Sequence, residues 1–401
     1  MFAGNINNVK VLYLRNPSKI VNIQFFTNIG SSDEALHEYG VAHFLEHMFF
    51  KGTLKRDAKK INHDADLIGA KINAWTWHDL TNYHLSVMSD NFEKGFELLS
   101  DIYLNSTFPE NEFDKEKTVI LSEIRRYDDD PPTYLGDESL NYFCEGGVGH
   151  KVSGTEESVK KLSLNNLLTF KKQYYGGDNV MISIVGDIDF STVENAIKKY
   201  FNNFPCSPST PLKTCNYRTG FLQLKKAEIH ESQYQLIFPA LPYLQPRAFI
   251  QNFMTYVLGG NSSALLFERI REELGLCYGI YSRVNYFEGF NYIDISTGCA
   301  EKDIETLHSE VLDIIVKLRK EKINSERLEM VKSAMLSSLF MSIESSSGLN
   351  TFLALSYLKG EKEDIINKRV SQIKAITIED IIEIADFTFK SPSLRAQLTT
   401  A

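Results

Sequence analysis

The positions of apolar and polar residues along the first half of the chain predict short strands alternating with longer helices. Apolar runs and residue-by-residue alternation, which are typical of strands, occur at 9–14, 21–29, 71–77, 83–88 and 179–185. Apolar residues three and four positions apart, which are typical of helices, occur at 39–50, 58–68, 92–104, 133–143, 163–174 and 191–200. A further helix is predicted from Pro109 to Tyr127, and Gly69 is predicted to end the second helix as its C′ residue.

The second half of the chain repeats this order of elements. Strands are predicted at 232–238, 277–284 and 290–297, and helices at 249–258 and 303–318. They follow one another as the strand, helix, paired strands and helix of the first half do. The pattern therefore predicts an α+β protein of two homologous domains, each a mostly antiparallel sheet covered by helices.

A proline-rich segment near the middle of the chain is the best candidate for a linker. Residues 204–211 contain Pro205, Pro208 and Pro211 and show little periodicity. We therefore predict an N-terminal domain at 1–205, a linker at 206–216 and a C-terminal domain at 217–401. A chain of 401 residues is also longer than one compact core usually supports.

Composition and charge exclude several classes of protein. The chain is 43% apolar and 24% charged, as expected of a soluble globular protein, and its net charge is −9. An acidic chain has no general basic surface for nucleic acid or an anionic membrane, so neither is predicted as a partner. No apolar run reaches membrane-spanning length, and the N-terminus does not resemble a secretory signal. The five cysteines include no CxxC pair, which favours reduced thiols and a cytoplasmic location.

The segment His43-Phe44-Leu45-Glu46-His47 carries candidate metal chemistry. On a helix, His43 and His47 project from one face about one turn apart, so their imidazoles can share one zinc ion. Glu46 is placed to reach a water molecule on the metal without binding the metal itself. The motif alone is only moderately specific for a metal site.

A zinc site that performs catalysis usually has three protein ligands, so one more is needed. The helix that begins at Pro109 offers four glutamates, at positions 110, 112, 116 and 123. Glu116 and Glu123 lie seven residues apart and so share one helix face. Their spacing alone does not decide which of them binds the metal and which orients a histidine N–H.

Residues 39–53, which contain this motif, resemble the signature of the pitrilysin/insulinase metallopeptidases, whose order of residues is of the inverzincin type. In that family the third ligand is a glutamate 76 residues beyond the second histidine, which here is Glu123. The resemblance thus implies one Zn²⁺ per chain, held by His43, His47 and Glu123. It also implies that Glu116 orients a histidine.

The resemblance extends to residues that would contact a substrate. Residues 72–76 resemble the strand on which Asn73 and Ala74 would hold a peptide as an added strand. Residues 271–278 resemble the segment whose arginine and tyrosine, here Arg271 and Tyr278, contact the substrate. Without the resemblance, these would be read as an ordinary strand, a helix-end cation and a core aromatic. Residues 150–154 and Ser32 depart from the family pattern, but neither departure involves the metal ligands.

The resemblance implies a zinc-dependent metalloendopeptidase in which Glu46 takes a proton from water and returns it to the leaving amine. Longer family members hold four such domains as a closing chamber, so this chain resembles half of the clamshell. A homodimer is the simplest assembly, and a heterodimer with a non-catalytic homologue is the alternative. The expected substrates are unfolded oligopeptides or leader and targeting peptides. A catalytically silent scaffold and a leader-peptide-binding subunit remain as alternative functions.

Overall fold

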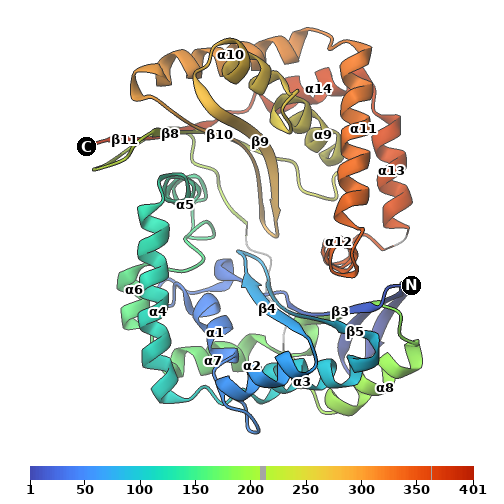
Figure 1. The fold of residues 1–401 in the computed structure, drawn as a ribbon. Helices are drawn as coiled ribbons and strands as arrows, with labels where there is room; N and C mark the ends of the chain where they lie inside the picture. Colours follow the sequence, from blue (N-terminus) through green and yellow to red (C-terminus); the bar gives the residue numbers. More distant parts are fainter. Residues whose placement is uncertain (208–213, 363) are drawn as a thin grey trace. The chain divides into compact units, whose positions relative to one another are not determined.

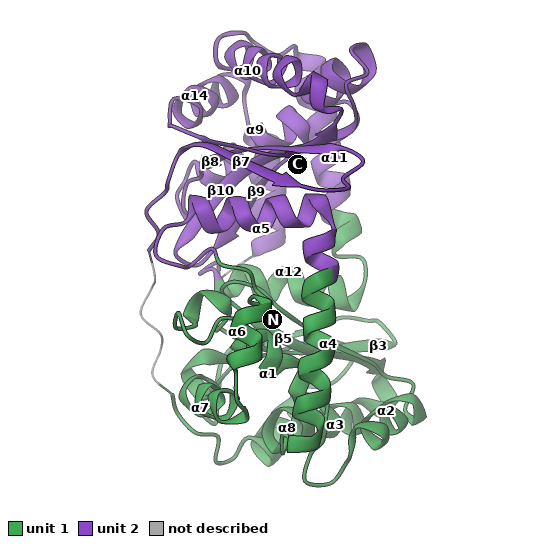
Figure 2. Cartoon of the chain, turned by 90° about the vertical axis from the view of Figure 1, so that its left-hand side faces the viewer, with its two compact units in different colours: residues 1–125, 150–213, 340–358 green, residues 126–149, 214–339, 359–401 purple. Residues whose placement is uncertain are grey.

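The computed structural model describes residues 1–207, 214–362 and 364–401, and they form two compact units. Unit 1 contains residues 1–125, 150–213 and 340–358, and unit 2 contains residues 126–149, 214–339 and 359–401 (Figure 2). Each unit therefore includes a segment from the other half of the chain, which the predicted domains 1–205 and 217–401 do not take into account. Most of the predicted linker, 208–213, lies outside the described residues.

Unit 1 is built on a six-stranded sheet in the order β1-β2-β6-β3-β5-β4. Figure 1 labels its strands β3, β4 and β5. Among the strands that the structure describes here, β2 and β6 run parallel and all other neighbours are antiparallel. Its strands are β1 (Phe2–Ile6), β2 (Val9–Arg15), β3 (Ile20–Thr27), β4 (Lys71–Thr76), β5 (Thr81–Met88) and β6 (Val180–Gly186). The predicted mostly antiparallel sheet is confirmed, and the parallel pair makes it mixed.

Helices of unit 1 share one apolar core with this sheet. They are α1 (Val41–Phe49), α2 (Ala58–Leu67), α3 (Phe92–Asn105), α4 (Glu110–Asp129), α6 (Glu156–Lys161), α7 (Leu164–Tyr174) and α8 (Phe190–Tyr200). Phe25 of β3 is fully buried and meets the rings of Phe96, Tyr103 and Phe201 edge-on at 5.5–5.7 Å between centroids. This core extends to α1, because Phe49 packs on Tyr103. The helix with the metal motif is therefore anchored in the apolar core of unit 1.

Unit 2 repeats the arrangement with a five-stranded sheet in the order β7-β11-β8-β10-β9. Here β7 and β11 form the parallel pair, as β2 and β6 do in unit 1. The strands are β7 (Gly220–Lys226), β8 (Ser232–Pro239), β9 (Cys277–Phe287), β10 (Phe290–Cys299) and β11 (Leu394–Thr400). The helices are α5 (Pro131–Phe143), α9 (Ala248–Gly259), α10 (Ile304–Lys320), α11 (Ser325–Ser342), α13 (Ile365–Ala375) and α14 (Ile378–Thr388). The matching strand order confirms the prediction of two homologous α+β halves.

The two halves of the chain exchange one helix each. Helix α12 (Ser346–Leu358) belongs to unit 1, where it packs on β3 and β6, and α5 belongs to unit 2, where it packs on β8 and β11. The face of β3 under α12 is polar, and Asn350 of α12 is fully buried against it. Its amide nitrogen lies 2.7 Å from Asn22 Oδ1 and 3.1 Å from the backbone oxygen of Ser183. Buried polar side chains of β3 thus find their partners on a helix from the second half.

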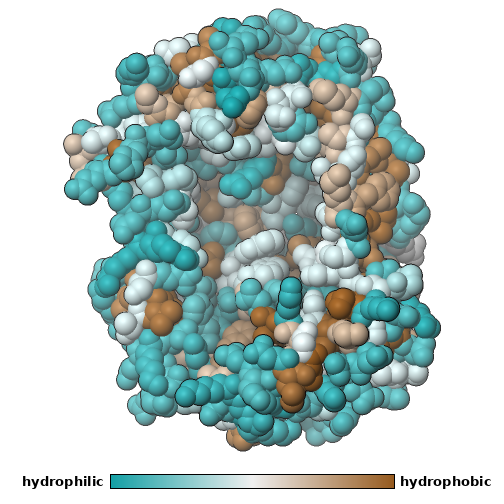
Figure 3. All heavy atoms as spheres, viewed as in Figure 1, coloured by the Kyte–Doolittle hydropathy of each residue, from teal (hydrophilic) through white to brown (hydrophobic). Residues whose placement is uncertain are grey.

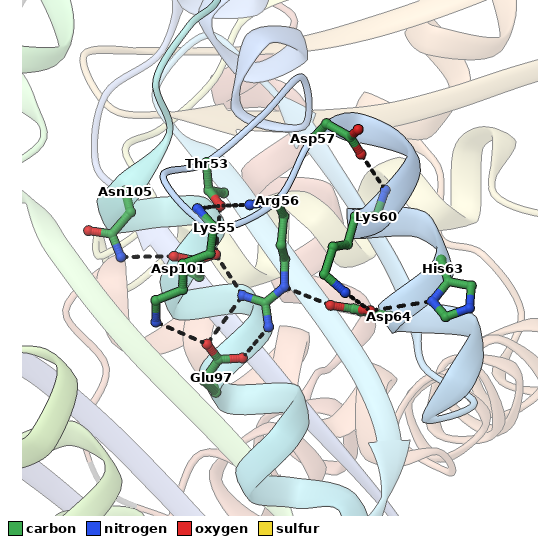
Figure 4. Close-up of polar contacts among 10 residues, drawn as sticks. All are labelled: Thr53, Lys55, Arg56, Asp57, Lys60, His63, Asp64, Glu97, Asp101 and Asn105. Carbon is green, nitrogen blue, oxygen red and sulfur yellow. Dashed lines mark hydrogen bonds and ion pairs between the residues drawn. The ribbon is translucent and has the colours of Figure 1, made fainter.

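The loop after α1 is held by a cluster of charged residues around Arg56 (Figure 4). Its guanidinium lies 2.6 Å from Asp101 Oδ2, 2.7 Å from Glu97 Oε2 and 2.9 Å from Asp64 Oδ2. Thr53 also donates a hydrogen bond to Asp101. The carboxylates come from α2 and α3, so the cluster connects the loop that follows α1 to both of these helices.

The surface is largely hydrophilic with scattered apolar patches on the face shown in Figure 3. Within the described residues, no helix combines the length and the apolar composition needed to cross a bilayer.

Candidate metal centre

Helix α1 is fixed at its N-terminus by a buried carboxylate. Gly40 precedes the helix with φ = 93°, and a Cβ at this position would lie 2.7 Å from the backbone oxygen of Ser153. The Glu34 carboxylate accepts hydrogen bonds from the backbone N–H groups of Gly40 and Ala42, at 2.7 and 2.8 Å. It is also 2.8 Å from His150 Nε2. The hydrogen bonds from Gly40 and Ala42 satisfy backbone N–H groups that the helix itself leaves unpaired.

Three side chains converge between α1 and α4. His43 and His47 lie one turn apart on α1, with 4.6 Å between their ring centroids. Glu123 Oε2, from α4, is 3.6 Å from His47 Nε2 and 3.9 Å from His43 Nε2. One ligand atom from each of the three residues lies within 4.8 Å of the other two. The structure thus brings together the three predicted ligands.

The second glutamate of α4 contacts the far side of one histidine. Glu116 Oε1 lies 2.8 Å from His47 Nδ1, and Glu116 Oε2 lies 2.5 Å from Lys51 Nζ. Burial tends to raise the pKa of Glu116, but the hydrogen bonds from His47 and Lys51 outweigh it and lower the pKa. Glu116 is therefore held as a carboxylate. It occupies the position from which it would fix the ring of His47 and direct Nε2 toward Glu123.

The electrostatics of His43 suit a neutral ligand. Burial, with the charge of the neighbouring His47, lowers its pKa to about 4. Its Nδ1 is buried and has no hydrogen-bond partner among the described residues. An imidazole that stays unprotonated near neutral pH keeps a lone pair available for a metal ion.

The donor set fits zinc. Nitrogen and oxygen ligands about 2.1 Å from a tetrahedral ion lie roughly 3.4 Å from one another, close to the 3.6 and 3.9 Å between the histidine nitrogens and Glu123. Two imidazoles and one carboxylate leave the fourth position of such an ion open, as sites that act on a water molecule require.

Glu46 lies next to these ligands without belonging to them. Its carboxylate is buried and accepts a hydrogen bond of 2.5 Å from Thr76 Oγ1, at the end of β4. Burial raises the pKa of Glu46, and the Thr76 hydrogen bond opposes this only in part. A carboxylate with a raised pKa is a stronger base than one in water, which suits it to proton transfer.

The residues predicted to contact a substrate fall into two groups. Asn73 and Ala74 lie on β4, an edge strand of unit 1 whose described partner is β5, and Asn73 is exposed. Arg271 lies in a π-helix (Phe267–Glu273) of unit 2, and its Nε donates to the backbone oxygen of Tyr278 at 3.1 Å. Tyr278 is 86% exposed, so the sequence-only reading of a core aromatic is wrong.

Sequence reasoning did not single out three residues that support the site: Glu34, Lys51 and Thr76. Lys51 and Thr76 stand inside the segments that carried the resemblance, but their partners are distant in sequence. The role of Glu34 could have been suspected from its position, since acidic residues shortly before a helix often cap its N-terminus.

Known proteins resemble this chain over nearly its whole length. The profile described as insulinase (peptidase family M16) matches residues 10–151, and the profile described as the peptidase M16 inactive domain matches residues 161–335. A Bacillus subtilis protein named as an uncharacterized zinc protease is 30% identical over 382 residues, which cover 94% of this chain and 93% of that protein. The chain belongs to the insulinase family of peptidases, family M16.

Other known proteins are similar to nearly the whole chain. A Rickettsia felis protein named as an uncharacterized zinc protease is 29% identical over 92% of this chain and 90% of its own. A protease from Helicobacter pylori has the same fold, with a TM-score of 0.93, 20% identity and coverage of 99% of this chain and 98% of that one. A Pseudomonas fluorescens structure, titled as a peptidase M16 inactive domain, also has a TM-score of 0.93, at 18% identity over 100% of this chain and 98% of that one.

Proposed function

We propose that this M16-family chain is a zinc-dependent metalloendopeptidase with one Zn²⁺ in unit 1. The observation that carries the proposal is the convergence of ligand atoms from His43, His47 and Glu123 within 4.8 Å, beside the buried carboxylate of Glu46. The second unit carries no HxxEH motif in its sequence, and the inactive-domain profile, matched at residues 161–335, covers its residues 214–335. Metal chemistry is therefore assigned to unit 1 alone.

Each residue of the site has a distinct role in peptide hydrolysis. A zinc ion held by His43, His47 and Glu123 would acidify a bound water and polarise the scissile carbonyl. Glu46 would take a proton from the attacking water and later deliver it to the leaving amine. Thr76 holds the Glu46 carboxylate in place, and Glu116 holds His47.

The substrates proposed are unfolded oligopeptides, including leader or targeting peptides. The edge strand β4 supports this, because an extended peptide can add to a free strand edge through backbone hydrogen bonds with little demand on its sequence. Asn73 and Ala74 would hold that peptide. Arg271 and Tyr278 would reach the zinc site of a partner subunit and complete the substrate contacts there, with Tyr278 steadying the carbonyl oxygen.

The proposed assembly is a homodimer that forms a chamber. This chain carries both the metal residues and the pair Arg271 and Tyr278, so two copies supply everything that a closed chamber needs. Light scattering on the active peak from size-exclusion chromatography tests this. Activity confined to dimers supports the homodimer, whereas fully active monomers contradict it and activity only with an added homologue indicates a heterodimer.

Replacement of Glu46 by Gln tests the catalytic assignment. The variant keeps the three ligands, so it should retain zinc while hydrolysis of a quenched fluorescent peptide falls by at least about 100-fold, the usual contribution of general base catalysis. Glu110→Gln is the matched control, because Glu110 is exposed at the start of α4. Normal turnover by the Glu46→Gln protein would refute the assignment, and peptide binding without cleavage by the native protein would indicate a binding subunit.

A further inference from the structure

Four of the five cysteines lie in unit 2, and they form two pairs that differ in chemistry. Cys277 and Cys299 are opposite each other in the antiparallel pairing of β9 and β10. Cys144, at the C-terminal end of α5, and Cys215 approach each other from segments 71 positions apart in the sequence. All five cysteines are free thiols.

Cys144 and Cys215 are held together by the backbone and by neighbouring rings. Cys144 forms an antiparallel bridge with Tyr217, and the N–H of Glu145 donates to the backbone oxygen of Asn216 at 2.9 Å. The ring of Tyr217 stacks on that of Phe143 with 4.7 Å between centroids, which fixes the bridge from the side. The bridge places Cys215 diagonally across from Cys144, close enough for each thiol to change the pKa of the other. The Cys215 thiol also donates to the backbone oxygen of Asn216 at 3.2 Å.

The two thiols of this pair differ in burial and acidity. Cys144 is 1% exposed, whereas Cys215 is half-buried and open to small solutes. The neighbouring Cys144 thiol and a hydrogen bond from the Glu145 backbone lower the pKa of Cys215 against the effect of its burial. The neighbouring Cys215 thiol, together with burial, raises the pKa of Cys144. An accessible thiol of lowered pKa beside a second thiol is the arrangement found in redox-sensing cysteines.

In the pair of Cys277 and Cys299, by contrast, neither thiol has a lowered pKa. Burial raises the pKa of Cys299 to about 12, and burial also raises that of Cys277. Neither thiol is favoured as a thiolate, although their opposed positions would bring the two Cα atoms within reach of a disulfide. Cys277 and Cys299 therefore serve as an internal control, because they lie opposite each other but neither has a lowered pKa.

We propose that Cys144 and Cys215 are a reversible oxidation site, at which a small peroxide converts the two thiols to an intramolecular disulfide. The Cys215 thiolate attacks one peroxide oxygen, the O–O bond breaks, and a sulfenic acid and one water form, with the proton that Cys215 released. Cys144 sulfur then attacks the Cys215 sulfur. The S–S bond forms, the S–O bond breaks, and the leaving hydroxide takes up the Cys144 proton as a second water. Two electrons pass from the thiols to the peroxide.

The disulfide would join two parts of the chain that meet only by folding. Residues 126–149 enter unit 2 from the first half, and Cys215 lies at the point where the chain re-enters unit 2 after residue 213. A bond between them closes a long loop and constrains the unfolded chain, so the oxidised form should unfold at a higher temperature than the reduced form.

Thiol mapping on the intact, reduced protein tests the proposal without reference to peptidase activity. After brief treatment with hydrogen peroxide and alkylation of the remaining thiols, mass spectrometry should find a Cys144–Cys215 disulfide and two fewer alkylated cysteines, and dithiothreitol should restore both. In Cys144→Ser, Cys215 should stop at a sulfenic acid that dimedone traps. Cys299→Ser should form the Cys144–Cys215 bond as the native protein does.

Two outcomes would overturn the proposal. One is that all five cysteines can still be alkylated after peroxide treatment, which would show that no thiol was oxidised. The peroxide dose must be one that oxidises a low-pKa thiol in a reference protein. The other is preferential formation of a Cys277–Cys299 disulfide, which would show that proximity alone decides. Both readouts are independent of zinc and of peptide cleavage, so failure here leaves the proposed peptidase function untouched.

Discussion

The residues of the metal centre differ in how far the sequence alone reveals them. The positions of His43 and His47 follow from helical spacing, because four residues on a helix bring two side chains to one face. Spacing could not separate Glu116 from Glu123, since both lie on one face of α4. The structure separates them by distance, with Glu123 near both imidazoles and Glu116 on the outer nitrogen of one.

Replacement of each glutamate by Gln should give distinct results. Glu123→Gln is expected to lose stoichiometric zinc, because it removes a charged ligand. Glu116→Gln is expected to keep zinc with about 10–100-fold lower affinity, the usual effect of losing a residue that orients a ligand. Competition with a chromophoric chelator measures both. Loss of zinc from Glu116→Gln alone, with tight binding by Glu123→Gln, would reverse the two roles.

At the scale of elements, regular amphipathic patterns could be predicted and irregular ones could not. The motif helix, predicted at 39–50, is α1 (Val41–Phe49), and the following helix ends with Gly69 at φ = 65° as predicted. The pattern-based predictions stop at residue 318, and α11 to α14 were missed. Helix α12 shows the reason, because its buried face includes Ser346, Asn350 and Ser356, and so lacks a simple apolar stripe.

The Arg56 cluster is an element-scale contact whose loss can be measured. Asp101 is almost fully buried, so Arg56→Met leaves its carboxylate short of its main counter-charge. We expect a loss of about 3–5 kcal/mol in the free energy of unfolding, the range for a broken buried ion pair. Both tryptophans, Trp75 and Trp77, lie in unit 1, so their fluorescence in urea reports this unit.

A second variant separates charge from packing at this cluster. If the uncompensated carboxylate causes the loss, Arg56→Met combined with Asp101→Asn should recover part of the stability. A double variant no more stable than Arg56→Met would show that the packing of Arg56, not its charge, matters.

At the scale of the whole molecule, the exchange of α5 and α12 between the two units could not be predicted from the sequence. Repeats and a proline-rich segment predicted a division near the middle of the chain, but contacts between distant segments decide which unit a helix joins. The buried polar residues Asn22 and Gln24 on β3 mark where a partner is needed. They do not identify that partner, which comes from residues more than 300 positions away.

Substitution of Asn350 tests the contribution of α12 to unit 1. Asn350→Leu leaves buried polar groups of β3 and β6 without their partner, each worth roughly 1–3 kcal/mol. Asn111→Leu, on the exposed surface of α4 in unit 1, is the matched control and should change stability little. The midpoint of tryptophan fluorescence in urea should therefore fall for Asn350→Leu only. Equal midpoints for both variants would contradict a structural role for this network.

The central claim is that the histidines of α1 and Glu123 of α4 hold a zinc ion on which peptide hydrolysis depends. The most direct test is the metal content of the purified protein, measured together with cleavage of a quenched peptide before and after chelation. We predict one zinc per chain, loss of cleavage on chelation and its return on addition of zinc. Full cleavage by metal-free protein would contradict the claim.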